Sequence, residues 1–273
     1  MKNLSASYDP AVALDFFKAG GKVEKIPQGE VIFAEEKKRF LGERMYLLID
    51  GEVSLLTGKK VIGSVKAGEV FGEMAAITEA PRSATAVAKK DSQLIGLNDR
   101  QFKAALKKKP GFALMLMSAM IARLRETLAR LKAAGAIPEN AKPKQTAIFD
   151  PKDLADIVRG LSSDEPVFYM QGKTIVKEGQ AAARMYAVLE GKVSVSIAGR
   201  TVDVVGPGGV FGELALLDQS TRMATATAET DCSLQPITRN ALLALVKLKP
   251  ELGLDLLSAL AARLRLLTAK LKG

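Results

Sequence analysis

The chain contains no histidine and a single cysteine, Cys232. Without histidine it cannot form zinc sites built on imidazole, nucleophile pairs of the Ser-His or Cys-His kind, or a histidine acid–base catalyst. One cysteine also excludes an intrachain disulfide. Because these absences remove much of enzyme chemistry, we expect no catalytic residues, no metal ligands and no cofactor, in a protein that is not an enzyme.

Long apolar runs are missing as well. No segment approaches the roughly 18–20 apolar residues that a membrane-spanning helix needs. The N-terminal stretch MKNLSASYDPAVALDFF lacks the apolar core of a signal peptide. We therefore expect a cytoplasmic protein without a membrane span.

The residues that are present fit a soluble globular chain. Of 273 residues, 48% are hydrophobic and 26% are charged, and this length is enough for two domains. The net charge is +10, and the basic residues gather in three runs: KAALKKKP from residue 103, ARLRETLARLK from residue 122 and ARLRLLTAKLK from residue 262. A basic surface attracts nucleotides, nucleic acids or acidic proteins. We interpret most of these runs as solvated helix faces, because they alternate with leucine and alanine.

The sequence repeats itself at an offset of 140 residues. RMYLLIDGEVSL at 44–55 matches RMYAVLEGKVSV at 184–195, and the basic segment at 106–132 matches 246–272. Upstream, QGEVIF at 28–33 matches QGKTIV at 171–176 at an offset of 143, so the first copy has three extra residues in AEEKKRFLGE, which we predict to be a surface loop. A period this long indicates duplication of a whole domain rather than a solenoid.

Each copy is predicted to contain many short strands followed by helices. Alternating residues at 45–65 break at Asp50-Gly51 and Thr57-Gly58, which predicts hairpins at both places. Residues 83–98 predict two more strands, DRQFKAALKKK predicts a helix with an acidic cap that ends before Pro110, and residues 111–135 predict a long helix. The expected fold class is α+β, with two β-roll (jelly-roll) domains that each end in a long helix. We place the first domain at 1–134, a proline-containing linker at 135–148 and the second domain at 149–273.

The most unusual repeated segment is FGEMAAITEAPRSATA at 71–86, which returns as FGELALLDQSTRMATA at 211–226. Each predicts a strand end that turns into one helical turn. Arg82 and Arg222 offer guanidinium groups suited to phosphate oxygens, whereas Glu73 and Glu213 would repel phosphate but accept a hydrogen bond from a sugar hydroxyl and hold the arginine. Phosphate beside a ribose hydroxyl describes a nucleotide.

These motifs resemble the phosphate-binding cassettes of cyclic nucleotide-binding domains, the family found in catabolite activators, kinase regulatory subunits and cyclic nucleotide-gated channels. The resemblance covers nearly all of both copies. It implies that the glutamate binds the ribose 2′-hydroxyl, that the arginine binds the cyclic phosphate and that the two backbone amides after the arginine assist. The ligand-binding residues it implies are Gly72, Glu73, Met74, Arg82, Ser83 and Ala84 in the first copy, and Gly212, Glu213, Leu214, Arg222, Met223 and Ala224 in the second.

The nucleotide is expected to be cyclic AMP, with cyclic GMP as the alternative. In this family a threonine directly after the arginine accompanies selectivity for cyclic GMP, and this chain has Ser83 and Met223 there. Thr127 and Thr268 lie on the long helices where they would contact the base, although each fits an exposed helix position equally well. Because Met223 has no hydroxyl and is bulky, we expect the second site to be the weaker one.

Two functions of different class remain open. One is a two-site cyclic nucleotide receptor that acts on a separate, unidentified effector protein. The other is a scaffold of degenerate rolls that needs no nucleotide, or the regulatory subunit of a kinase or other effector. The residues after each long helix are too few for a helix-turn-helix, so direct DNA binding is not expected.

The long helices carry apolar residues at spacings of 3 and 4. The stripes consist of Met117, Met120, Leu124, Thr127 and Leu131 in the first copy, and Leu257, Leu260, Leu264, Leu267 and Leu271 in the second. An apolar stripe with this spacing is typical of a helix that packs against another helix. We expect them to pair within one chain as a pseudo-dimer, and a homodimer through the same stripes is the alternative.

Overall fold

The computed structural model describes residues 8–35, 43–78, 80–135 and 164–270, and the side chains only as far as residue 265. The described residues form two compact units, one of residues 8–115 and one that begins at Leu116. The predicted domain bounds at 134 and 149 follow the sequence repeat and stay a prediction. Most of the predicted linker and of the three-residue insertion lies outside the described residues.

The first half begins with helix α1 (Pro10–Lys18) and continues as short strands. Two four-stranded antiparallel sheets follow, with strand orders β1-β8-β3-β6 and β2-β7-β4-β5. The strands are β1 (Val23–Ile26), β2 (Val31–Phe33), β3 (Arg44–Asp50), β4 (Glu52–Thr57), β5 (Lys60–Lys66), β6 (Val70–Phe71), β7 (Thr85–Ala88) and β8 (Ser92–Asn98), with helix α2 (Glu73–Thr78) between β6 and β7. Helices α3 (Asp99–Lys108) and α4 (Gly111–Ala133) come last.

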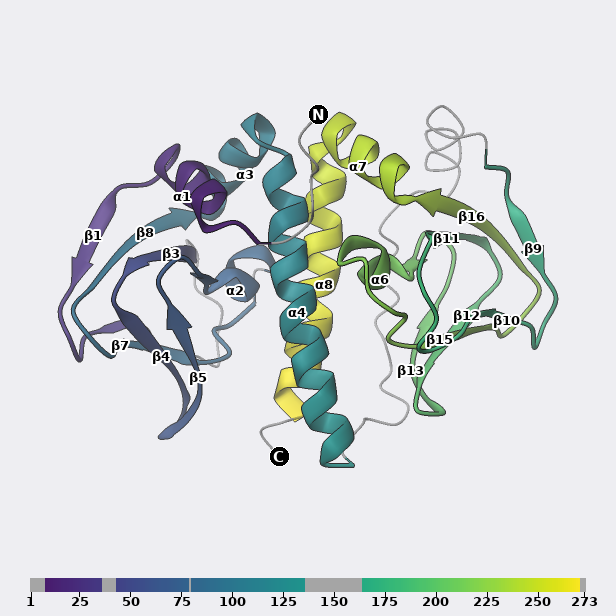
Figure 1. Ribbon diagram of the computed structural model, residues 1–273, viewed down its shortest axis with the longest axis horizontal. Helices are drawn as coiled ribbons and strands as arrows, with labels where there is room; N and C mark the ends of the chain where they lie inside the picture. Colours follow the sequence, from purple (N-terminus) through teal and green to yellow (C-terminus); the bar gives the residue numbers. More distant parts are fainter. Residues whose placement is uncertain (1–7, 36–42, 79, 136–163, 271–273) are drawn as a thin grey trace. The chain divides into compact units, whose positions relative to one another are not determined.

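The second half repeats this order. Its sheets have the strand orders β14-β11-β16-β9 and β10-β15-β12-β13. The elements are β9 (Val167–Tyr169), β10 (Thr174–Val176), β11 (Arg184–Glu190), β12 (Val193–Ile197), β13 (Arg200–Val205), β14 (Val210–Phe211), α6 (Glu213–Leu217), β15 (Thr225–Ala228), β16 (Cys232–Thr238), α7 (Arg239–Leu248) and α8 (Pro250–Lys270). In each half the strands curl into a roll (Figure 1), which confirms the predicted fold class.

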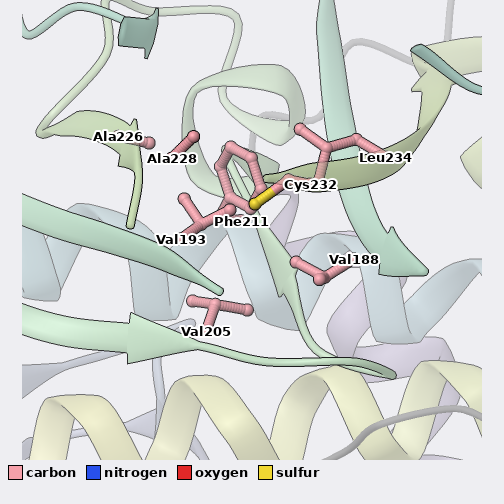
Figure 2. Close-up of a cluster of buried hydrophobic side chains, with 8 residues drawn as sticks. All are labelled: Val188, Val193, Val205, Phe211, Ala226, Ala228, Cys232 and Leu234. Atoms are coloured by element: carbon pink, nitrogen blue, oxygen red, sulfur yellow. The ribbon is translucent and has the colours of Figure 1, made fainter. Parts of the chain in front are cut away.

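The core of each roll uses the same positions of the repeat. In the second roll Phe211 lies among valines, alanines and a leucine that face it from both sheets (Figure 2). The first roll buries Phe71 with residues that correspond to these at the offset of 140, such as Leu48 for Val188. Small alanines on β7 and β15 leave room for the phenylalanine ring, so the two sheets pack closely.

One predicted turn is wrong. Asp50-Gly51 was expected to close a hairpin, but β3 pairs with β6 and β8, whereas β4 pairs with β5 and β7. The chain therefore crosses at Gly51 from one sheet to the other. Gly51 has φ +98°, and a Cβ there would meet Ser92 and the Asp91 carbonyl. The hairpin at Thr57-Gly58 is confirmed by the pairing of β4 with β5.

The predicted helices are confirmed, with one change at a cap. Helix α3 ends before Pro110 and α4 ends at Ala133, close to Gly135 in the left-handed conformation. The cap of α3 is Asn98 rather than an acidic residue, and Asn98 and Gln101 form a reciprocal capping box. Among the helices that the structure describes, none combines the length and apolar character needed to cross a membrane.

Candidate functional site

The first cassette begins at a left-handed glycine between a two-residue strand and a short helix. Gly72 has φ +72°, and a Cβ there would come within 2.8 Å of the Arg82 Nη1. Glycine is required because a side chain would both strain this backbone and displace the guanidinium. The segment therefore folds so that Arg82 can reach back across the turn to the Gly72 carbonyl, 2.9 Å from Nη1.

The Arg82 guanidinium is buried and surrounded by protein groups. Its Nη2 donates to the Arg44 carbonyl at 2.7 Å and forms an ion pair with Glu43. The group also stacks on Phe33, with Cζ 4.1 Å from the ring centroid. Only 5% of the Arg82 side chain is exposed, so its charge is taken out of water and compensated by a carboxylate and an aromatic face.

The second cassette repeats the turn but not the compensation. Gly212 has φ +80° and follows β14, and Arg222 donates through Nη1 to its carbonyl at 2.8 Å. Nη2 donates to the Arg184 carbonyl. In the part of the chain that the structure describes, Arg222 forms no ion pair. Burial lowers the pKa of the Arg222 guanidinium below its ordinary value, although the nearby Tyr186 and Glu213 act in the opposite direction.

The glutamates at the start of α2 and α6 are buried too. Glu73 is 2% exposed and Glu213 is 3% exposed. Glu213 forms an ion pair with Arg263 of α8, whose guanidinium also lies 3.7 Å from Asp203. The Glu213 carboxylate raises the pKa of Arg263. Glu213 was expected to hold Arg222 of its own cassette, but the ion pair it forms is with Arg263 of helix α8.

Comparison with known proteins identifies the family of the two segments that contain these cassettes. The family described as Cyclic nucleotide-binding domain matches residues 23–109 and 166–248, more than half of the chain. The chain belongs to the cyclic nucleotide-binding domain family. The two matches coincide with the two rolls and include both cassettes, so the predicted resemblance is confirmed at the level of the family.

Similar proteins include kinases and bacterial receptors. A cGMP-dependent protein kinase of Toxoplasma gondii is 33% identical over 222 residues, which cover 80% of this chain and 19% of the kinase. The Cyclic AMP receptor protein of Thermus thermophilus is 39% identical over 127 residues, which cover 45% of this chain and 59% of the receptor. This chain therefore spans about a fifth of that kinase and less than two thirds of that receptor.

Comparison with solved structures also found matches. The structure of cAMP-bound PfPKA-R is 23% identical, with a TM-score of 0.33, and the match covers 85% of this chain and 74% of that chain. The Thermus thermophilus Catabolite Activator Protein is also 23% identical, with a TM-score of 0.41, and the match covers 62% and 74% of the two chains.

The other residues expected at a cyclic nucleotide site differ in how far they are buried. Ala84 is buried, and Met74, Ser83, Leu214, Met223 and Ala224 are half-buried. Thr127 is half-buried on α4, and the Thr268 side chain lies outside the described residues. At the offset of 140 the counterpart of Thr127 is Leu267, so the two threonines do not occupy equivalent positions in the two domains.

Sequence reasoning missed three residues that lie outside the cassettes in the sequence but contact their side chains in the structure. Glu43 and Phe33 around Arg82 correspond to Ala183 and Val176 in the second copy. Arg263 belongs to a run that we interpreted as solvated, yet it pairs with a buried carboxylate. The sequence did contain a hint of this role, because an arginine, Arg123, also stands at the equivalent position of the first long helix.

Proposed function

We propose that the chain is a non-enzymatic receptor that binds a cyclic nucleotide in each of its two cassettes and signals to a separate protein. The observation that carries this proposal is the environment of Arg222. Its guanidinium is buried, is held by two main-chain carbonyls and has no carboxylate paired with it among the described residues. A buried cation without an anion is costly, and an anionic ligand that reached it would relieve that cost.

The neighbouring glutamates support a sugar beside that anion. Glu73 and Glu213 each begin the helix that follows the cassette glycine. A carboxylate accepts hydrogen bonds and repels phosphate, so a ligand that satisfies both groups carries a hydroxyl close to its phosphate. The ribose 2′-hydroxyl of a cyclic nucleotide meets that requirement.

Cyclic AMP is the nucleotide we propose. Ser83 and Met223 stand directly after the arginines, and neither is the threonine that accompanies cyclic GMP selectivity in the family. Relatives whose names contain each nucleotide match this chain, so the choice rests on these two positions. Titration with each nucleotide separately tests it, and tighter binding of cyclic GMP would reverse the assignment.

Thermal melting tests the receptor function directly. A ligand at 100 times its dissociation constant adds roughly 2.7 kcal/mol to folding stability for one site, which raises the melting temperature by a few degrees. We expect this shift with cyclic AMP and expect it to disappear in the Arg82→Ala, Arg222→Ala double variant. If the double variant melts normally and neither nucleotide shifts the unsubstituted protein, the chain is a scaffold rather than a receptor.

A further inference from the structure

Helix α4 ends the first repeat, yet one of its side chains holds the cassette of the second. Arg125 donates through Nε to Asp218 Oδ2 at 2.5 Å and through Nη2 to Oδ1 at 3.1 Å. The same Nη2 donates to the Ser220 hydroxyl and, at 3.0 Å, to the Thr221 carbonyl. All four residues belong to the compact unit that begins at Leu116.

The segment that Arg125 contacts leads directly to Arg222. Asp218 caps the end of α6, and its carboxylate accepts hydrogen bonds from the Ser220 amide at 3.2 Å and from the Ser220 hydroxyl at 2.6 Å. The Arg222 amide donates to the Gln180 carbonyl at 2.8 Å. The loop is thus held by the roll at its end and by α4 along its length. A bidentate arginine–carboxylate pair fixes orientation as well as distance.

The first cassette has different residues at the positions that Arg125 contacts in the second. Thr78, Ala80 and Pro81 stand where the second cassette has Asp218, Ser220 and Thr221. The Thr78 hydroxyl donates within its own helix to the Met74 carbonyl at 2.6 Å. The first cassette therefore lacks the Asp218 carboxylate and the Ser220 hydroxyl that Arg125 contacts in the second.

We propose that Arg125 is a positioning residue of the second cassette, so that ligand binding there depends on helix α4 of the first repeat. The inference rests on the proposed function, because the ligand is the cyclic nucleotide assigned above. Arg125 sets the loop from which the Arg222 side chain reaches the phosphate. Since α4 is a continuous helix that begins at the end of the first roll, occupancy of the second site and the state of this helix are linked.

The test compares Arg125→Ala with Arg130→Ala, both in a protein whose first site is removed by Arg82→Ala. Arg130 lies on the same helix, and its ion pair among the described residues is with Glu126 one turn away. Both side chains are exposed, so Arg130→Ala controls for the loss of one charge. We expect Arg125→Ala to weaken cyclic AMP binding about three- to tenfold by calorimetry, or about 0.7–1.4 kcal/mol. Arg125→Lys should recover part of the loss, because lysine keeps the charge but not the bidentate geometry.

A second readout needs no ligand. Amide hydrogen exchange at residues 218–224 should be faster in Arg125→Ala than in Arg130→Ala, and Asp218→Asn added to Arg125→Ala should cause little further change. Equal exchange and equal affinity in the two variants would overturn the inference. Absence of cyclic AMP binding in every variant, together with faster exchange in Arg125→Ala only, would instead refute the proposed ligand and leave the positioning role of Arg125 supported.

Discussion

Arg82 and Arg222 occupy the same position of the repeat, but their charges are compensated differently. Arg82 is paired with Glu43 and stacked on Phe33, whereas the described partners of Arg222 are two carbonyl oxygens. Since a carboxylate beside the first guanidinium would compete with an incoming anion, we expect Glu43 to oppose ligand binding at the first site. Met223 is expected to weaken binding at the second site instead, and this stays a prediction.

Exchanging the residues at positions 43 and 183 tests this difference. Glu43→Gln removes the competing charge, while the Gly72 and Arg44 carbonyls still hold the Arg82 guanidinium. We expect cyclic AMP affinity at the first site to rise roughly tenfold, because like charges a few ångströms apart repel by about 1–4 kcal/mol near a protein surface. Calorimetry in an Arg222→Ala background measures the first site alone.

The reciprocal variant is Ala183→Glu, measured in an Arg82→Ala background. It should weaken the second site by a comparable factor, because it supplies the carboxylate that Arg222 lacks among the described residues. A decrease of first-site affinity in Glu43→Gln would show that Glu43 positions the arginine for the ligand rather than competing with it.

At the scale of elements, the cassette depends on a turn that only glycine fits well. Gly212 has φ +80°, and a Cβ there would collide with the Arg222 Nη1. Gly212→Ala should therefore weaken cyclic AMP binding at the second site by at least tenfold and also lower the melting temperature. Gly199→Ala is the matched control, since Gly199 has φ +79° but a Cβ there would meet nothing within 4 Å.

The two glycine variants separate backbone strain from displacement of the arginine. Both pay the cost of a left-handed alanine, about 1–2 kcal/mol. If Gly199→Ala reduces ligand affinity as much as Gly212→Ala does, the effect comes from general destabilisation, and the argument about the cassette turn fails.

Local patterns predicted the elements well because each element is specified within a few residues. Alternating residues gave the strands, and capping residues and Pro110 gave the limits of α3. The error at Asp50-Gly51 has a physical reason. The sequence Asp-Gly indicates that the chain turns, but it does not indicate whether the strands on either side of the turn pair with each other. Strands β3 and β4 instead pair with other strands in different sheets, and this choice depends on packing between distant parts of the chain.

The candidate site was predictable only in part for a similar reason. The repeated motif drew attention to Glu73, Arg82, Glu213 and Arg222, which are all buried in the structure. Arg263 contacts Glu213 across 50 residues and Arg125 contacts Asp218 across 93. Contacts between residues this far apart cannot be predicted from their spacing in the sequence, because the fold brings them together. Basic residues on a helix look alike in sequence whether they face solvent or a buried carboxylate.

At the scale of the whole molecule, the apolar stripes of the long helices bear on the proposed pseudo-dimer. Met117, Met120, Leu124 and Leu131 of α4 are buried, and so are Leu257, Leu260 and Leu264 of α8. These residues all belong to the compact unit that begins at Leu116, while Leu271 and the Leu267 side chain lie outside the described residues. The described leucines and methionines of the stripes are therefore covered within one chain and offer little apolar surface to a second copy.

We therefore predict that the protein is a monomer whose long helices pair within the chain. Light scattering at micromolar concentration should give a mass near the 29.1 kDa of one chain, with and without cyclic AMP. Leu264→Glu places a charge at a 3% exposed position of α8 and should lower the melting temperature strongly while leaving the mass unchanged. A mass of about twice one chain that falls to a single chain in Leu264→Glu would show instead that the stripes pair between two copies. In that case the helix that holds the second cassette belongs to a dimer interface, and ligand affinity should depend on protein concentration, which titrations at two concentrations detect directly.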